Sequence, residues 1–138
     1  MTQPAWAMAA VPSGTRVGHW SVTDGLAMRR IRAEVASAAP GGTDPCLTSS
    51  PARRIELVFS ELVSNALRHG GAPVQVTLSR VDDRWLIDVA DASPTPPAPR
   101  MVGQFDAGGR GLLIISRLAD RCGWTTVNGV KHVWAEVA

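Results

Sequence analysis

The chain has 138 residues, of which 45% are hydrophobic and 19% charged, and its formal net charge at pH 7 is +2. These values are typical of one soluble globular domain with a sizeable core, and they exclude a disordered chain. Lys and Arg form no cluster, so no nucleic-acid surface is predicted. The two cysteines fit neither a disulfide framework nor a zinc site, which favours a reducing cytoplasm.

The first half of the chain predicts an arm, a strand and two helices. Residues 1–14, rich in alanine with two prolines, predict a flexible N-terminal arm, and residues 15–138 a single domain. The apolar stretch 5–11 is too short to span a membrane and lacks the basic start of a signal peptide. Weak alternation predicts a strand over 16–22, and Asp24 is a suitable cap for a helix over 25–38.

A second helix carries the most informative polar residues. Its apolar stripe is Ile55, Val58, Phe59, Leu62 and Ala66, with Pro51 in the first turn and Gly70-Gly71 at the end. Glu61 and Asn65 are one turn apart on one shoulder of that stripe. A carboxylate and an amide at the rim of a buried face are placed to face a cleft. The alternative is that both are solvated flank residues.

The next segment predicts a β-hairpin that ends on a carboxylate. Residues 74–81 alternate cleanly, Asp82-Asp83 forms the turn, and residues 85–91 follow as the second strand. Asp91 continues the apolar face of that strand, where a bare carboxylate is costly to bury. It therefore has a partner or a ligand, or it caps the following loop through backbone N–H groups.

The last part of the chain predicts a long loop, a helix and a second hairpin. Residues 92–109 contain four prolines and are too long for an accidental loop in a compact domain. Gly108-Gly109-Arg110-Gly111 then opens a helix over 112–121, which Cys122-Gly123 ends. The glycine-rich start suits an anion or serves as a flexible hinge. Strands at 124–127 and 131–137 flank Asn128-Gly129, a type I′ turn signal. This order predicts an α+β fold with helices on one face of a mainly antiparallel sheet.

Three of these segments together resemble a known family. Glu61 to Ala66 with His69-Gly70 resembles the N box of the GHKL, or Bergerat-fold, ATP-binding superfamily. Asp91 looks like the aspartate of its first G box, and the segment from Gly108 to Leu112 resembles its second G box. The resemblance covers residues 16–137 and implies a two-layer α/β sandwich with a lid loop over 92–109. The short chain looks most like bacterial anti-sigma factor serine kinases of the switch-protein-kinase type.

The resemblance also implies roles for single residues. Asn65 would coordinate Mg²⁺ on the phosphates of ATP, Glu61 would be the general base, and Asp91 would accept a hydrogen bond from the adenine amino group. The backbone of Gly108, Gly109, Gly111 and Leu112 would surround the phosphates, and Arg110 could pair with the terminal phosphate. Ser93 could supply a hydroxyl to the base or to a bridging water.

The same resemblance implies partners and two interpretations. The substrate would be a serine on a small anti-anti-sigma protein of the STAS type, the second partner a sigma factor, and a homodimer is expected. The first G box usually reads Asp-x-Gly-x-Gly, whereas this chain has Asp91-Ala92-Ser93-Pro94-Thr95 without glycine. That departure favours the alternative of a protein-binding module with weak or no kinase activity. A detached histidine-kinase-like ATPase domain is a third possibility.

Overall fold

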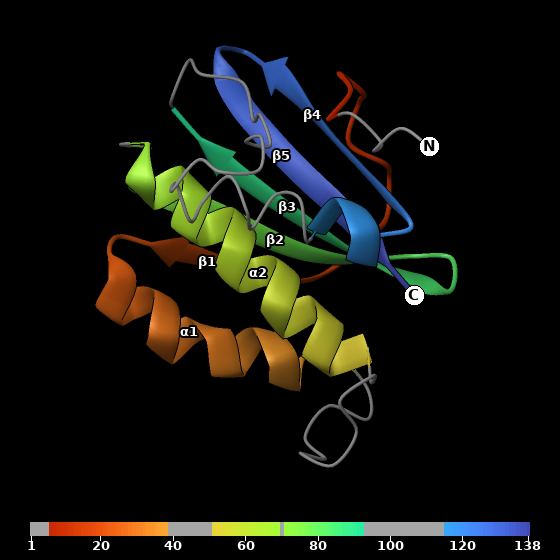
Figure 1. Ribbon diagram of the computed structural model, residues 1–138, viewed down its shortest axis with the longest axis horizontal. Helices are drawn as coiled ribbons and strands as arrows, with labels where there is room; N and C mark the ends of the chain where they lie inside the picture. Colours follow the sequence, from red (N-terminus) through yellow and green to blue (C-terminus); the bar gives the residue numbers. More distant parts are fainter. Residues whose placement is uncertain (1–5, 39–50, 70, 93–114) are drawn as a thin grey trace.

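The computed structural model describes residues 6–38, 51–69, 71–92 and 115–138. Five strands form one antiparallel sheet in the order β1-β2-β3-β5-β4, and both helices α1 and α2 cover the same face of it (Figure 1). The predicted α+β fold is therefore confirmed. The elements are β1 Thr15–Val22, α1 Gly25–Ser37, α2 Pro51–Arg68, β2 Val74–Val81, β3 Arg84–Asp91, β4 Arg121–Val127 and β5 Val130–Val137.

Local chemistry explains the boundaries of these elements. The Asp24 carboxylate accepts a hydrogen bond from the Ala27 amide at 2.8 Å, which satisfies one of the free N–H groups at the start of α1. Asn128 and Gly129 have φ angles of 51° and 79°, as the predicted type I′ turn between β4 and β5 requires. Both the helix start and the hairpin turn therefore lie where the sequence predicts them.

The core lies between the sheet and the helix layer. From α2 it takes the predicted apolar stripe, and from the sheet it takes the in-phase residues of each strand. Its fully buried members include Val22, Ile55, Val58, Phe59, Val74, Val76, Leu78, Ile87, Val89, Ala135 and Val137. Within the described ranges, no helix has the length and apolarity needed to cross a membrane.

The region around Arg121 differs from the prediction. A helix was expected to continue to Arg121 and to end at Cys122-Gly123, but the helical residues 115–118 stop earlier and β4 already begins at Arg121. A Cβ atom on Gly123 would lie 2.9 Å from the Trp134 ring, so this glycine makes room for a neighbouring side chain inside a strand. The prediction that Gly123 ends a helix is therefore wrong, because this glycine lies within β4.

The end of the N-terminal arm runs beside β4. The Ala9 amide donates to the Trp124 carbonyl at 2.9 Å, the Trp124 amide donates to the Ala7 carbonyl at 3.1 Å, and Trp6 is buried. The Trp134 indole also donates to the Ala9 carbonyl at 3.0 Å. The sequence predicts a flexible arm over residues 1–14. Movement of this arm away from the sheet would break these contacts.

Candidate functional site

The two flanks of α2 have different surroundings. The Ser64 hydroxyl lies 3.4 Å from the Met28 sulfur, and the Glu56 carboxylate pairs with Arg32 at 3.9 Å, so one flank rests on α1. At about 100° per residue, Glu61 and Asn65 lie on the opposite flank of the apolar stripe. These two side chains therefore share a side of the helix that α1 leaves uncovered.

Glu61 and Asn65 differ in burial. Asn65 is only 4% exposed, whereas Glu61 is partly exposed. The simple alternative of two solvated flank residues is therefore wrong for Asn65. No hydrogen bond joins the Asn65 side chain to another described residue. A buried amide oxygen is a ligand that Mg²⁺ accepts beside water and phosphate oxygens, so Asn65 suits the metal role that the resemblance implies.

The end of α2 brings this helix to β3. The Gly71 amide donates to the Ala66 carbonyl at 3.1 Å, which satisfies one of the free carbonyl groups at the end of the helix. A Cβ atom on Gly71 would lie 2.5 Å from the Asp91 Cβ. Only a glycine leaves room for this approach, so the helix end and Asp91 are packed directly against each other. Gly70, the other glycine of the predicted helix end, lies outside the described residues.

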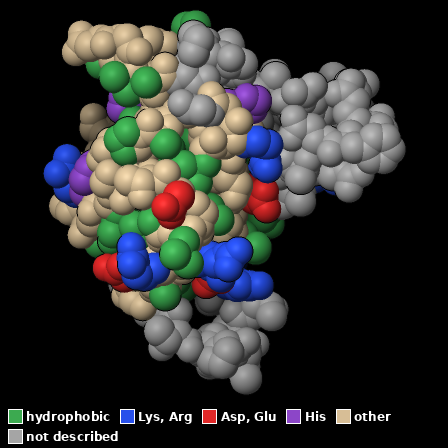
Figure 2. All heavy atoms as spheres, turned by 90° about the vertical axis from the view of Figure 1, so that its left-hand side faces the viewer, with side chains coloured by type: hydrophobic (Ala, Val, Ile, Leu, Met, Phe, Trp, Pro, Cys, Tyr) green, Lys and Arg blue, Asp and Glu red, His purple; other side chains and the backbone are tan. Residues whose placement is uncertain are grey.

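Asp91 lies where the strand alternation predicts it. Trp85, Ile87 and Val89 of the same strand face are buried, and Asp91 continues that face with 3% exposure. The C-terminal end of α2, the end of β3 and the start of β5 lie on the same side of the molecule, at the left of Figure 1. On that side, seen face-on in Figure 2, basic and acidic side chains are intermixed in small groups. The candidate site is thus a buried carboxylate beside the helix end that carries Asn65.

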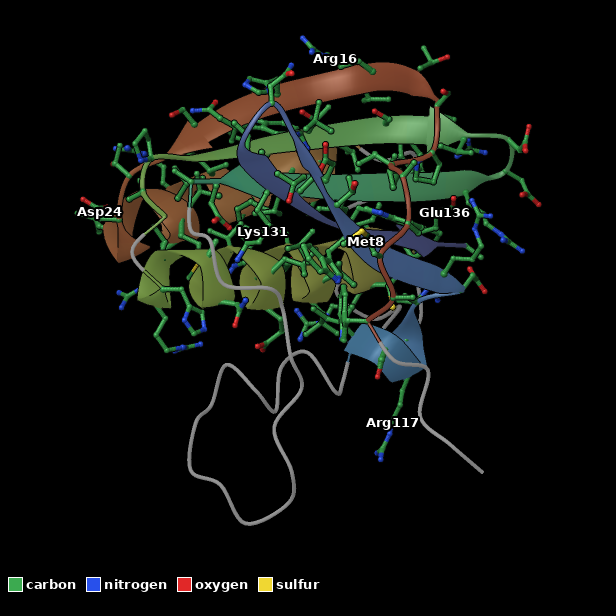
Figure 3. The ribbon with its side chains drawn as sticks, turned by 90° about the horizontal axis from the view of Figure 1, so that it is seen from above. Met8, Arg16, Asp24, Arg117, Lys131 and Glu136 are labelled. Atoms are coloured by element: carbon green, nitrogen blue, oxygen red, sulfur yellow. The ribbon has the colours of Figure 1, made fainter. Side chains whose placement is uncertain are left out.

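The structure adds Lys131, a residue to which the sequence argument gave no role. It stands opposite Asp91 in the register of β3 and β5, is 3% exposed, and has its ammonium nitrogen 3.6 Å from Asp91 Oδ1. In Figure 3 its side chain points from the sheet towards α2. The alternation Lys131, Val133, Ala135, Val137 could have revealed it, because strand alternation places Lys131 on a buried face just as it does Asp91.

The remaining predicted site residues are not described. Ser93, Gly108, Gly109, Arg110, Gly111 and Leu112 lie outside the described residues, as does most of the predicted lid. The chain is described again from Ile115, which is helical and fully buried in the core. Among the described residues, no three His, Cys, Asp or Glu side chains lie close enough to hold a metal ion.

The opposite face of the sheet holds another ionisable pair. The His132 Nδ1 atom lies 3.0 Å from Asp88 Oδ2. Burial raises the pKa of Asp88, and the neighbouring His132 opposes that rise. Burial also raises the pKa of the Cys122 thiol, which makes it a poor nucleophile. The pair of Asp88 and His132 does not join the site beside α2, because Asp88 and Asp91 are three residues apart on a strand and face opposite sides. Cys122 lies on β4 opposite Ala135, four residues along β5 from Lys131.

Comparisons with known proteins agree with this geometry. A family described as histidine kinase-like ATPase domain matches residues 23–137. The signal transduction histidine-protein kinase AfsQ2 of Streptomyces coelicolor is 39% identical over 54 residues, covering 39% of this chain and 10% of that protein. The sensor protein TorS of Escherichia coli is 34% identical over 90 residues, covering 57% of this chain and 10% of that protein. The matches thus span about a tenth of the length of either relative.

Proposed function

The chain belongs to the histidine kinase-like ATPase domain family, and on this premise we propose that it binds Mg²⁺-ATP beside α2 and transfers phosphate to a protein side chain. The observation that carries the proposal is the packing of Gly71, at the end of the helix with Glu61 and Asn65, against the buried Asp91. In the more specific form of this proposal, the phosphate acceptor is a serine of a STAS-type anti-anti-sigma protein. A sigma factor is then the second partner, and the chain forms a homodimer.

Each residue of the site has one role in this proposal. Asp91, a buried acceptor, receives a hydrogen bond from the amino group of the base. Asn65 offers its amide oxygen to Mg²⁺. ATP, when bound, supplies the phosphoryl group. Glu61 is partly exposed and one turn before Asn65, so it can meet an incoming hydroxyl and take its proton.

A second candidate function is a regulatory protein-binding module with weak or no kinase activity. Two features favour it: the first G box segment 91–95 has no glycine, and Asp91 already has the Lys131 ammonium beside it. The third possibility, a detached ATPase domain that serves a histidine kinase, is supported by the similarity to AfsQ2, a signal transduction histidine-protein kinase, and to the sensor protein TorS. The three candidates differ in whether phosphate is transferred and to which side chain.

Glu61→Gln tests the kinase proposal, because glutamine keeps the size of the side chain and loses its basicity. We expect Mg²⁺-ATP binding by calorimetry to be unchanged. Phosphate transfer to a co-purifying partner should fall by about 10²–10⁴-fold. Glu56→Gln is the matched control: Glu56 lies on the same helix, but its carboxylate pairs with Arg53 at 2.8 Å and Arg32 at 3.9 Å on the other flank.

The outcomes separate the candidates. Transfer by Glu61→Gln at the wild-type rate shows that Glu61 is not the base. A wild-type protein that binds a partner tightly and transfers no phosphate supports the binding module. Acid-labile phosphate on a partner histidine, in place of acid-stable phosphoserine, supports the third possibility.

A further inference from the structure

Lys131 is an unusual residue in this chain. It is the only lysine among 14 basic residues, and it is one of the most deeply buried charged side chains that the structure describes. The described arginines, in contrast, lie at exposed or partly exposed positions. The single lysine thus places its compact ammonium group inside, next to Asp91, whereas the described arginines reach the surface.

The pair of Lys131 and Asp91 is poorly suited to stabilise the fold. Its Nζ–Oδ1 distance of 3.6 Å exceeds the 2.7–3.2 Å of a good N–H···O hydrogen bond. Both side chains are almost fully withdrawn from water, at 4% and 1% exposure. Replacing a buried ion pair by two apolar side chains of similar volume is often neutral or stabilising, so the burial of this pair is weak evidence that it serves the fold.

The geometry of the pair suits the edge of a base instead. An ammonium donor and a carboxylate acceptor stand side by side, 3.6 Å apart, on the same face of two neighbouring strands. Adenine presents the complementary pattern on either side of its amino group, because each adjoining edge offers a ring nitrogen that accepts a hydrogen bond. A carboxylate alone would read only the amino group.

We propose that Lys131 is a second base-reading residue, which donates a hydrogen bond to the ring nitrogen next to the amino group that Asp91 accepts. This inference rests on the proposed nucleotide site and specifies what that site reads. Together, Asp91 and Lys131 would select a base that has a hydrogen-bond donor next to a hydrogen-bond acceptor. A base with the amino group but without the neighbouring ring nitrogen should lose the contribution of Lys131.

Deaza analogues test the inference. In 1-deaza-ATP and 7-deaza-ATP a carbon replaces one of the two candidate ring nitrogens and the amino group remains. We expect the wild-type protein to bind ATP about ten- to a hundredfold more tightly than one of the two analogues, the range for a hydrogen bond to a charged group. In Lys131→Met this preference should disappear. Arg121→Met is the control, since Arg121 pairs with Glu136 elsewhere on β5 and its loss should leave the preference intact.

A second measurement needs no variant and covers the case in which Lys131→Met does not fold. Because the chain has one lysine, ¹⁵N-lysine labelling gives a single side-chain ammonium signal. ATP should shift this signal, and the discriminated deaza analogue should shift it much less. The inference is overturned if all three nucleotides bind equally tightly, or if the preference for ATP survives in Lys131→Met. It is also overturned if that variant binds ATP more tightly than the wild type, or if ATP does not shift the ammonium signal. A wild-type protein that binds no nucleotide overturns the proposed function as well, so the two failures are distinguishable.

Discussion

The paired strands β3 and β5 bury a carboxylate near each end, and the two carboxylates are neutralised in different ways. Glu136 is 2% exposed, but its partners Arg121, at 2.6 Å, and Arg84, at 3.7 Å, keep 57% and 41% of their side chains in water. Asp91, at the other end, has a partner that is itself buried. Figure 3 shows the labelled Lys131 and Glu136 well apart along the sheet.

The two ends of this strand pair differ in the free-energy cost of burying charge. At Glu136 the arginine head groups remain hydrated, so the ion pairs close the surface over the strand at small cost. At Asp91 both charges have left water, which costs several kcal/mol per ion and is repaid only in part by their attraction. The pair that is more costly to bury, Asp91 with Lys131, is therefore the one next to Gly71 and the helix of Glu61 and Asn65.

Removal of one cation from each end gives the largest expected contrast. Lys131→Met leaves Asp91 buried without its cation, so we expect the free energy of unfolding to fall by about 3–5 kcal/mol. Arg121→Met should cost much less, because the partly exposed Arg84 still pairs with Glu136. Urea denaturation of both variants measures the contrast. Equal losses would show that the two ends are electrostatically alike.

Removal of the charge from each carboxylate separates ligand binding from stability. Asp91→Asn places an amide donor where the base presents its own amino group, so ATP binding should weaken by roughly 2–4 kcal/mol, the cost of a mismatched buried polar contact. Glu136→Gln should leave ATP affinity unchanged, whatever its effect on stability. Calorimetry on both variants provides the test, and an unchanged affinity in Asp91→Asn removes this carboxylate from the proposed site.

The smallest effect concerns the packing around Asp91. Gly71→Ala forces a methyl group against the Asp91 side chain, and we expect a loss of about 1–3 kcal/mol in stability, with weaker ATP binding because the carboxylate moves. Gly25→Ala is the control: Gly25 is the first residue of α1, and a Cβ atom there meets nothing within 4 Å. That variant should be as stable as the wild type or slightly more stable. If Gly71→Ala and Gly25→Ala change the melting temperature equally, the close approach of Gly71 to Asp91 does not affect stability.

The fold could be predicted largely from local patterns. Strand alternation, the Asp24 cap and the Asn128-Gly129 turn depend on neighbours in the sequence, and each lies where it was expected. The start of β4 could not be found in this way. Gly123 resembles a helix terminator until the ring of Trp134, eleven residues later, is seen to need its space.

The candidate site, too, could be predicted only where it depends on neighbours in the sequence. Asp91 was singled out because a carboxylate interrupts an apolar face, and its predicted burial is confirmed. Lys131 interrupts an apolar face too, but its pairing with Asp91 depends on the register between β3 and β5, which the sequence does not encode locally. The roles of Glu61, Asn65 and Asp91 in catalysis and binding stay predictions.

The contacts between residues 7–9 and β4 bear on where a minimal folded fragment can begin. The family match starts at residue 23, yet β1 and the residues that hydrogen-bond to Trp124 and Trp134 all precede it. A fragment cut at that boundary would uncover the outer edges of β2 and β4 at once. Strand edges exposed in this way invite pairing with other chains, so such a fragment would be prone to self-association. The sequence limits of a family and the physical limits of its folded unit are therefore not the same here.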